Sequence, residues 1–186
     1  EKSLRLEATA RLEAFRAVSQ AARLRLPDLV LKADARGSGR HFEGEFTLSG
    51  HGLRGQTAPL KFDLPHLITT GTFDRRDNQF RVTGRTQLKG GGVELPAHDI
   101  RLMGLRATLP FTWPFDTATG RGRLAADDIT WQKISLGGLR GRIRQANTGG
   151  VFELTHASKV LTGGHLHLGG TLGIGIGGRA PRLDLD

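Results

Sequence analysis

The sequence contains no cysteine and no tyrosine, and it has only two tryptophans and one methionine among 186 residues. Without cysteine, a disulfide framework and a zinc–thiolate site are both excluded. No long apolar run is present either: the nearest candidate, residues 160–178, holds eight glycines and two histidines, which a lipid-facing helix does not tolerate. No G-x-S-x-G, P-loop or H-E-x-x-H motif occurs. We therefore expect a protein that is not an enzyme and that uses no cofactor.

Glycine, by contrast, is abundant, with 27 of 186 residues against a typical share of about 7%. Each glycine inside a helix costs about 1 kcal/mol, so a helical bundle is excluded. Glycine does not recur at every third position, which excludes a collagen-like triple helix. Hydrophobic residues make up 37% of the chain, which is lean for a globule with a thick core.

The chain is basic, with 27 lysines and arginines, 18 acidic residues and a net charge of +9. Such a balance suits anionic partners, namely nucleic acid, phospholipid head groups or acidic glycolipid. However, the basic residues are scattered and form no run of five or more, so a solvated polar face explains them as well. Nucleic-acid binding needs basic and aromatic residues on one face. Here alternation places them on opposite faces, so we expect no nucleic-acid partner.

Apolar and polar residues alternate along most of the chain, which predicts half-buried β-strands. The alternation extends over residues 3–14, 42–48, 60–64, 80–89, 99–109, 129–143 and 152–176. The alanine content of residues 3–14 would also allow a helix there. Residues 15–24 are ambiguous between a short helix and a bend. A change of phase at Gln132–Lys133 predicts a bulge or tight turn, because a slip of one residue exchanges the two faces of a strand.

Glycine pairs and prolines punctuate this series. Proline is confined to strand starts, edges and bulges, so the pairs Leu26–Pro27, Leu64–Pro65, Leu95–Pro96 and Leu109–Pro110 predict strand boundaries. The segments "LPDL" at 26 and "LPHL" at 64 form a weak repeat. We predict an all-β fold with about 11–13 strands, in which residues 1–186 form a single segment of a long, curled antiparallel sheet. Because the sequence begins at Glu1, we expect it to be a piece of a longer chain.

One apolar face per strand must be covered. Two packed sheets would cover each other, whereas one strongly curled sheet would form a groove with an exposed apolar stripe, typical of a binding surface. Lipid acyl chains are the natural occupants, since exposing a sixteen-carbon chain to water costs about 12 kcal/mol at about 0.8 kcal/mol per methylene. The predicted groove lining is Phe46, Leu48, Leu60, Phe62, Phe80, Val82, Leu88, Ile100, Leu102, Ile129, Trp131, Leu139, Ile143, Phe152, Leu154, Leu166, Leu168, Leu172 and Ile174.

Three segments resemble a known family. "AADDITWQKISLGGLRGRIRQ" (residues 125–145) is similar to the repeat-like strands of the AsmA-like superfamily of bacterial envelope proteins, in particular its YdbH-type branch, whose C-terminal part carries a dicarboxylate-transport domain label. The resemblance rests on an isoleucine-x-tryptophan and a leucine-x-glycine pattern. "LPAHDIRLMGLRATLPF" (95–111) and "LTHASKVLTGGHLHLGGTLGIG" (154–175) resemble other strands of such proteins.

The resemblance implies a lipid-binding groove in the periplasm of a Gram-negative bacterium. Members of this superfamily resemble a long β-groove and are anchored in the inner membrane by an N-terminal helix. They are implicated in moving phospholipids between the inner and outer membranes. The implied partners are phospholipid acyl chains and an outer-membrane lipoprotein. The residues leave two alternatives open: a structural or assembly module of the cell envelope whose apolar face packs against a partner protein, and a binder of anionic glycolipid.

Other candidate sites are weaker. His165 and His167 share a strand face near His156, but no further ligand has convincing spacing, so we expect no metal site. Adjacent Asp127 and Asp128 would point to opposite faces of a strand, which favours a turn or strand start over acid–base chemistry. "GIGIGG" (173–178) lacks the helix and the downstream acidic residue of a dinucleotide fingerprint. "FTWPFD" (111–116) is either an exposed aromatic contact or, the interpretation we favour, a packed corner of the sheet.

Overall fold

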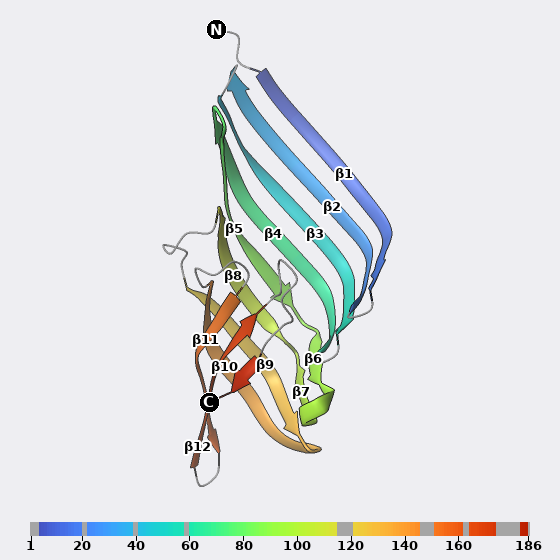
Figure 1. Cartoon of the computed structure of the whole chain (residues 1–186), viewed down its shortest axis with the longest axis vertical. Helices are drawn as coiled ribbons and strands as arrows, with labels where there is room; N and C mark the ends of the chain where they lie inside the picture. The colour runs from blue at the N-terminus through green and yellow to red at the C-terminus, as the bar shows by residue number, and fades with distance from the viewer. Residues whose placement is uncertain are drawn as a thin grey trace.

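The computed structural model of the chain describes residues 4–19, 22–38, 41–57, 60–114, 121–145, 151–161, 164–173 and 183–185. Side chains are described as far as Arg142. The described residues form one open antiparallel sheet of thirteen strands and a single 3₁₀ turn. The sheet is long and curled (Figure 1), which confirms the predicted all-β, groove-like fold class.

The elements are β1 Leu4–Val18, β2 Ala22–Ser38, β3 His41–Thr57, β4 Lys61–Arg76, β5 Gln79–Lys89, β6 Gly92–Leu95, η1 Pro96–His98, β7 Ile100–Met103, β8 Arg106–Trp113, β9 Gly122–Trp131, β10 Ile134–Gln145, β11 Val151–Leu161, β12 Gly164–Gly173 and β13 Leu183–Leu185. Neighbours in sequence are mostly neighbours in the sheet, in the order β1-β2-β3-β4-β5-β8-β9-β10-β11-β12-β13. Strands β6 and β7 form a hairpin off this path: β6 also pairs with β4, and β7 with β9. Thus β5 and β6 run along β4 in succession, and β7 and β8 do the same along β9.

The longest strands bend together along a line that crosses the sheet, which we call the corner (Figure 1). In β1 to β4 the corner consists of Ala14, Pro27, Gly52 and Pro65, and the ladder of paired residues skips each of these positions. Ala14 and Gly52 have positive φ angles of 55° and 68°. Residues with positive φ therefore alternate with prolines from strand to strand. A proline has no N–H to donate, so within a sheet it is confined to edges, strand starts and interruptions of the ladder such as these.

The corner continues into the neighbouring strands through glycines. Gly90 and Gly91 separate β5 from β6, Gly104 separates β7 from β8, and Gly137 lies in β10 beside a register shift. All four have positive φ, a conformation that glycine adopts without steric cost. In the described residues, the remaining positive φ angles belong to Asp77, Asp99, Gln132 and Lys133, in the hairpin turns and the 3₁₀ cap.

The apolar residues change parity at the corner. In β2 the apolar positions are even up to Leu26 and odd from Leu29, and in β4 they are even up to Leu64 and odd from Leu67. A Cβ placed on Gly50 would meet the side chains of Leu29 at 3.5 Å and Leu26 at 3.6 Å. Leucines on both sides of the corner therefore share one face, because the irregular backbone compensates for the change of parity.

The structure corrects one sequence-based prediction and resolves an ambiguous one. Pro27, Pro65 and Pro110 lie inside β2, β4 and β8 rather than at strand boundaries; only Pro96 follows the end of a strand. Residues 15–24 contain no helix in their described part, since β1 continues through the bend at Ala14 to Val18. The predicted turn at Gln132–Lys133 is confirmed, as these two residues join β9 to β10 and both have positive φ.

Candidate functional site

One face of the sheet, which we call the apolar face, carries an unbroken row of apolar and glycine residues. Cross-strand partners lie on the same face of a sheet, so the row can be followed through the register. Its members are Leu12, Leu29, Gly50, Leu67, Leu88, Ala107, Leu124 and Gly141. The register continues it to Ala157 in β11 and Leu168 in β12. The row therefore crosses ten strands without a charged residue.

A second row lies on the other side of the corner. It consists of Ala17, Leu24, Gly55, Phe62, Val93, Leu102, Ile129 and Gly137. A buried cluster of Ala126, Ile129 and Leu139, against which Leu102 and Leu136 pack, lies where the two rows meet in β9 and β10. The apolar face therefore has a small core at this end and remains open along β1 to β5.

Phenylalanine rings lie over glycines on the apolar face. A Cβ on Gly71 would be 2.8 Å from Cε1 of Phe46, and one on Gly84 would be 2.7 Å from Cζ of Phe111. The same relation joins Phe42 to Gly37, Phe73 to Gly44 and Phe62 to Gly55. Such pairs protect glycine in a strand, and they account for five of the 27 glycines. They also lay the rings along the sheet, which gives the face a low, apolar floor.

The floor contains one polar pair, Thr69 and Thr86. Their hydroxyl oxygens are 3.0 Å apart, so one donates to the other. Thr69 is buried, with 7% of its surface exposed. Because the two hydroxyls satisfy each other, this part of the floor offers little hydrogen-bonding capacity to a ligand.

The predicted lining residues with described side chains fall into three groups. Ile129 and Leu139 are buried, with 6% and 2% exposed, and Phe80 and Trp131 are exposed, with 43% and 48%. The others are half-buried: Phe46, Leu48, Leu60, Phe62, Val82, Leu88, Ile100 and Leu102. Register places Phe46, Leu48, Phe80, Val82 and Leu88 together on one side of the corner, and Phe62, Ile100, Leu102, Ile129 and Trp131 on the other.

The rest of the predicted lining extends past the described side chains. These residues belong to β11, β12 and the part of β10 after Arg142, where only the backbone pairing is described: Ile143, Phe152, Leu154, Leu166, Leu168 and Leu172. Ile174 lies outside the described residues, as do Phe115 and the part of "GIGIGG" that follows Gly173. Side chains of His156, His165 and His167 are likewise not described.

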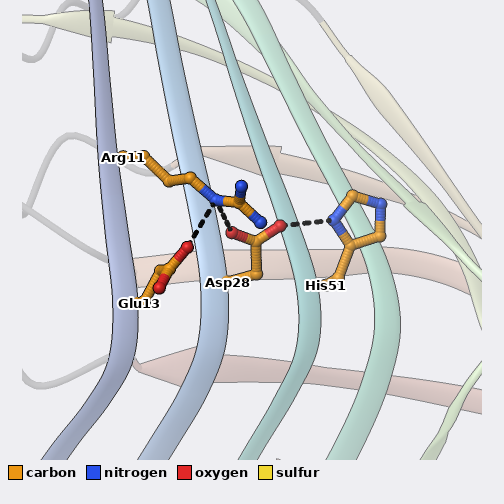
Figure 2. A network of polar contacts seen from close by, with 4 residues as sticks. All are labelled: Arg11, Glu13, Asp28 and His51. Carbon is orange, nitrogen blue, oxygen red and sulfur yellow. Dashed lines mark hydrogen bonds and ion pairs between the residues drawn. The ribbon is translucent and has the colours of Figure 1, made fainter.

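The opposite, polar face carries the charges in short networks. Asp28 on β2 accepts a hydrogen bond from Nε of Arg11 at 2.9 Å, while His51 Nδ1 lies 3.7 Å from its other oxygen (Figure 2). Arg11 Nε also lies 3.1 Å from Glu13. The hydrogen bond that Arg11 donates to Asp28, supported by the charges of Asp28 and Glu13, raises the pKa of Arg11. Asp34 and Glu7 raise the pKa of Arg5 in the same way.

Further ion pairs on this face join Arg54 to Asp63, Arg76 to Asp74, Arg101 to Glu94 and Arg106 to Asp127. All of these pairs are solvent-exposed, so each contributes little to stability. They lie on the face opposite the apolar rows. The ion-paired arginines thus lie on the polar face of the sheet, and the apolar rows lie on the opposite face. This arrangement agrees with the interpretation of the charge as a solvated polar face.

The weaker candidates also have structural roles. Asp127 and Asp128 lie inside β9 rather than at a turn or strand start. Asp128 accepts hydrogen bonds from Thr130, Ser135 and the backbone N–H of Gly137, which ties β9 to β10. Trp113 is 48% exposed beside Phe80, so the packed corner we favoured for this tryptophan is not what the structure shows. No group of three or more histidines or acidic residues suited to a metal ion occurs among the described residues.

Sequence reasoning missed residues of the apolar face, notably Leu29 and Leu67. In "LPDL" and "LPHL" two leucines three positions apart flank a proline. That odd spacing breaks the alternation, and it is the signal of a bend that keeps both leucines on one face.

A scan against protein-family models and searches of curated proteins and solved structures gave no significant match to the chain. Within the described part of the chain, no helix has the length and hydropathy needed to cross a membrane.

Proposed function

We propose that this chain is a segment of a lipid-binding groove, belonging to a bridge-like protein that moves phospholipids between the inner and outer membranes without catalysis. The observation that carries the proposal is the uncharged row across ten strands. Over β1 to β5 no second layer covers it within the described residues, and Leu4, Leu6, Leu12 and Leu31 are exposed. Contiguous exposed apolar surface on this scale is typical of a binding site.

Acyl chains match this surface in chemistry and in shape. They need an apolar floor with few hydrogen-bonding groups, and the floor offers one self-satisfied threonine pair. A continuous surface also lets an acyl chain slide, because no charged or polar residue interrupts the row. The free energy of transfer from water, about 0.8 kcal/mol per methylene, supplies the affinity.

The cellular setting of the proposal comes from the resemblance of residues 95–176 to the AsmA-like superfamily. The proposed setting is the periplasm of a Gram-negative bacterium, with an inner-membrane anchor in the full-length protein and an outer-membrane lipoprotein as partner. The curled antiparallel sheet agrees with that resemblance in fold class.

The test is photocrosslinking from the two faces of one strand. A photoreactive amino acid at Leu88 would lie on the apolar face, and one at Gln87 would lie on the polar face. Cells expressing the full-length protein should give lipid adducts at position 88 and none at position 87, detected by mass spectrometry. Protein adducts at position 88 without lipid would instead show that the face packs against a partner.

An assembly module is the second candidate, and β1 favours it. All fifteen residues of this strand are exposed, and as the first strand of the sheet order it leaves one edge open. Open edges of this length invite pairing with a further strand. A purified complex in which another strand or sheet covers both β1 and the apolar face would support assembly over lipid binding.

A further inference from the structure

The apolar face carries one charged residue on β1 to β5 and β8, and it lies at the end of the sheet farthest from the corner. In the register, Arg75 of β4 stands between Phe42 of β3 and Phe80 of β5. All other positions of the face on these strands are alanine, glycine, valine, leucine, phenylalanine, tryptophan or threonine, so none of them is charged. A charge at one end of an otherwise uncharged surface makes that surface amphipathic along its length.

Arg75 differs in its partners from those arginines of the polar face that form ion pairs. Six arginines of the polar face, Arg5, Arg11, Arg54, Arg76, Arg101 and Arg106, each form an ion pair with a carboxylate. Within the described residues, the polar contact of Arg75 is a hydrogen bond from Nε to the backbone oxygen of Asp77 at 3.3 Å. Its guanidinium charge is therefore not neutralised by a carboxylate of the described chain, and its Nη groups remain available as donors.

Aromatic side chains surround this end of the face. Ring centroids of Phe80 lie 6.3 Å from Phe73 and 6.0 Å from Trp113. Phe80 and Trp113 are 43% and 48% exposed. Toward this end of the sheet, the apolar floor is thus followed by the rings of Phe73, Phe80 and Trp113, and then by Arg75. Membrane proteins show the same order from the hydrocarbon core to the head groups, where tryptophan and arginine collect.

From this juxtaposition we infer that Arg75 binds the phosphate of a phospholipid whose acyl chains lie on the apolar face. The inference rests on the proposed lipid-binding function and adds to it an orientation, with the head group at the Arg75 end and the chains toward the corner. The strand is long enough for this arrangement. From Arg75 to Pro65 is ten residues, or about 33 Å at about 3.3 Å per residue, whereas the chains of one leaflet fill about 15 Å of a bilayer.

The neighbouring residue provides a matched control. Arg76 carries the same charge on the same strand, but it lies on the polar face and pairs with Asp74. Arg75→Gln and Arg76→Gln would be compared with the wild type for binding of two fluorescent lipids with identical chains, phosphatidylglycerol and diacylglycerol. Both arginines are exposed, so equal circular dichroism spectra and unfolding midpoints should show that both variants fold.

Arg75→Gln should weaken phosphatidylglycerol binding by about five- to tenfold, in line with one charge-assisted contact at an exposed site, and leave diacylglycerol binding unchanged. Arg76→Gln should change neither. Equal phosphatidylglycerol affinities of the two variants would overturn the inference while leaving the lipid-binding groove intact. If the wild type binds neither lipid, the groove and the inference both fail. Inorganic phosphate is the third probe: binding as tight as that of phosphatidylglycerol would indicate a free-anion site and also overturn the inference.

Discussion

The ring of Phe46 on β3 covers Gly71 on β4 so closely that a Cβ at Gly71 would lie 2.8 Å from Phe46 Cε1 and 2.5 Å from the backbone oxygen of Thr83. A phenylalanine over a glycine fills the space that two side chains would otherwise share. The pair recurs across the apolar face, and it keeps the rings flat where a pair of large side chains would stand up from the sheet. The glycine content of the chain is therefore tied to the shape of its apolar face.

Gly71→Ala should lower the free energy of unfolding by about 1–3 kcal/mol, because overpacking forces the ring and the backbone apart. Gly50→Ala is the matched control on the same face, where a Cβ would meet its nearest neighbour, Leu29 Cδ1, at an ordinary 3.5 Å. That variant should be neutral or stabilised by up to about 1 kcal/mol. Urea denaturation of both variants measures the difference; equal stabilities would contradict the close packing of Phe46.

At the corner, Gly52 and Ala14 share a positive φ but differ in side chain. Gly52→Ala should lower the free energy of unfolding by about 1–2 kcal/mol, since an L-residue in the left-handed region is strained. Ala14→Gly should have the opposite sign and raise it by up to about 1 kcal/mol, because the strain is removed. Thermal unfolding of the two variants gives the signs, and a shift in the same direction would show that the corner is not held by these residues.

The hydrogen bond between Thr69 and Thr86 should be visible in a double-mutant cycle. Thr69→Val alone leaves the Thr86 hydroxyl without its partner in the apolar floor, which should cost about 1–2 kcal/mol. The double variant Thr69→Val/Thr86→Val removes both hydroxyls and should recover most of that loss. Additive effects in urea denaturation would mean that the two hydroxyls do not interact.

A charged substitution within the uncharged row that crosses ten strands should separate the two proposed functions. Leu88 is half-buried beside Leu67 and Ala107, so Leu88→Asp should retain the strand content in circular dichroism while abolishing co-purified lipid. Gln87→Asp, on the polar face of the same strand, should affect neither. Loss of the folded state in Leu88→Asp alone would instead indicate that the face is the interior of a packed assembly.

Much of the fold could be predicted from the sequence. Alternation of period two in segments such as Phe42–Leu48 and Phe80–Leu88 sets which residues share a face, since side chains of a strand point to opposite sides in turn. It predicted the all-β class and the half-buried lining along β3 and β5. The phase change at Gln132–Lys133 located a hairpin for the same reason. These are local properties, and no distant contact is needed to produce them.

The corner and the Arg75 end required the tertiary structure. Pro27 and Pro65 are consistent with strand boundaries when each is considered alone; only the register shows that Gly52 faces both of them and that the bend crosses the sheet. Arg75 is one of 21 arginines in the sequence, and it is distinguished by its cross-strand neighbours Phe42 and Phe80. The sequence by itself determined which side chains alternate along each strand. Only the tertiary structure decided which of them meet across strands, because the pairing of residues far apart in the chain depends on where each strand bends.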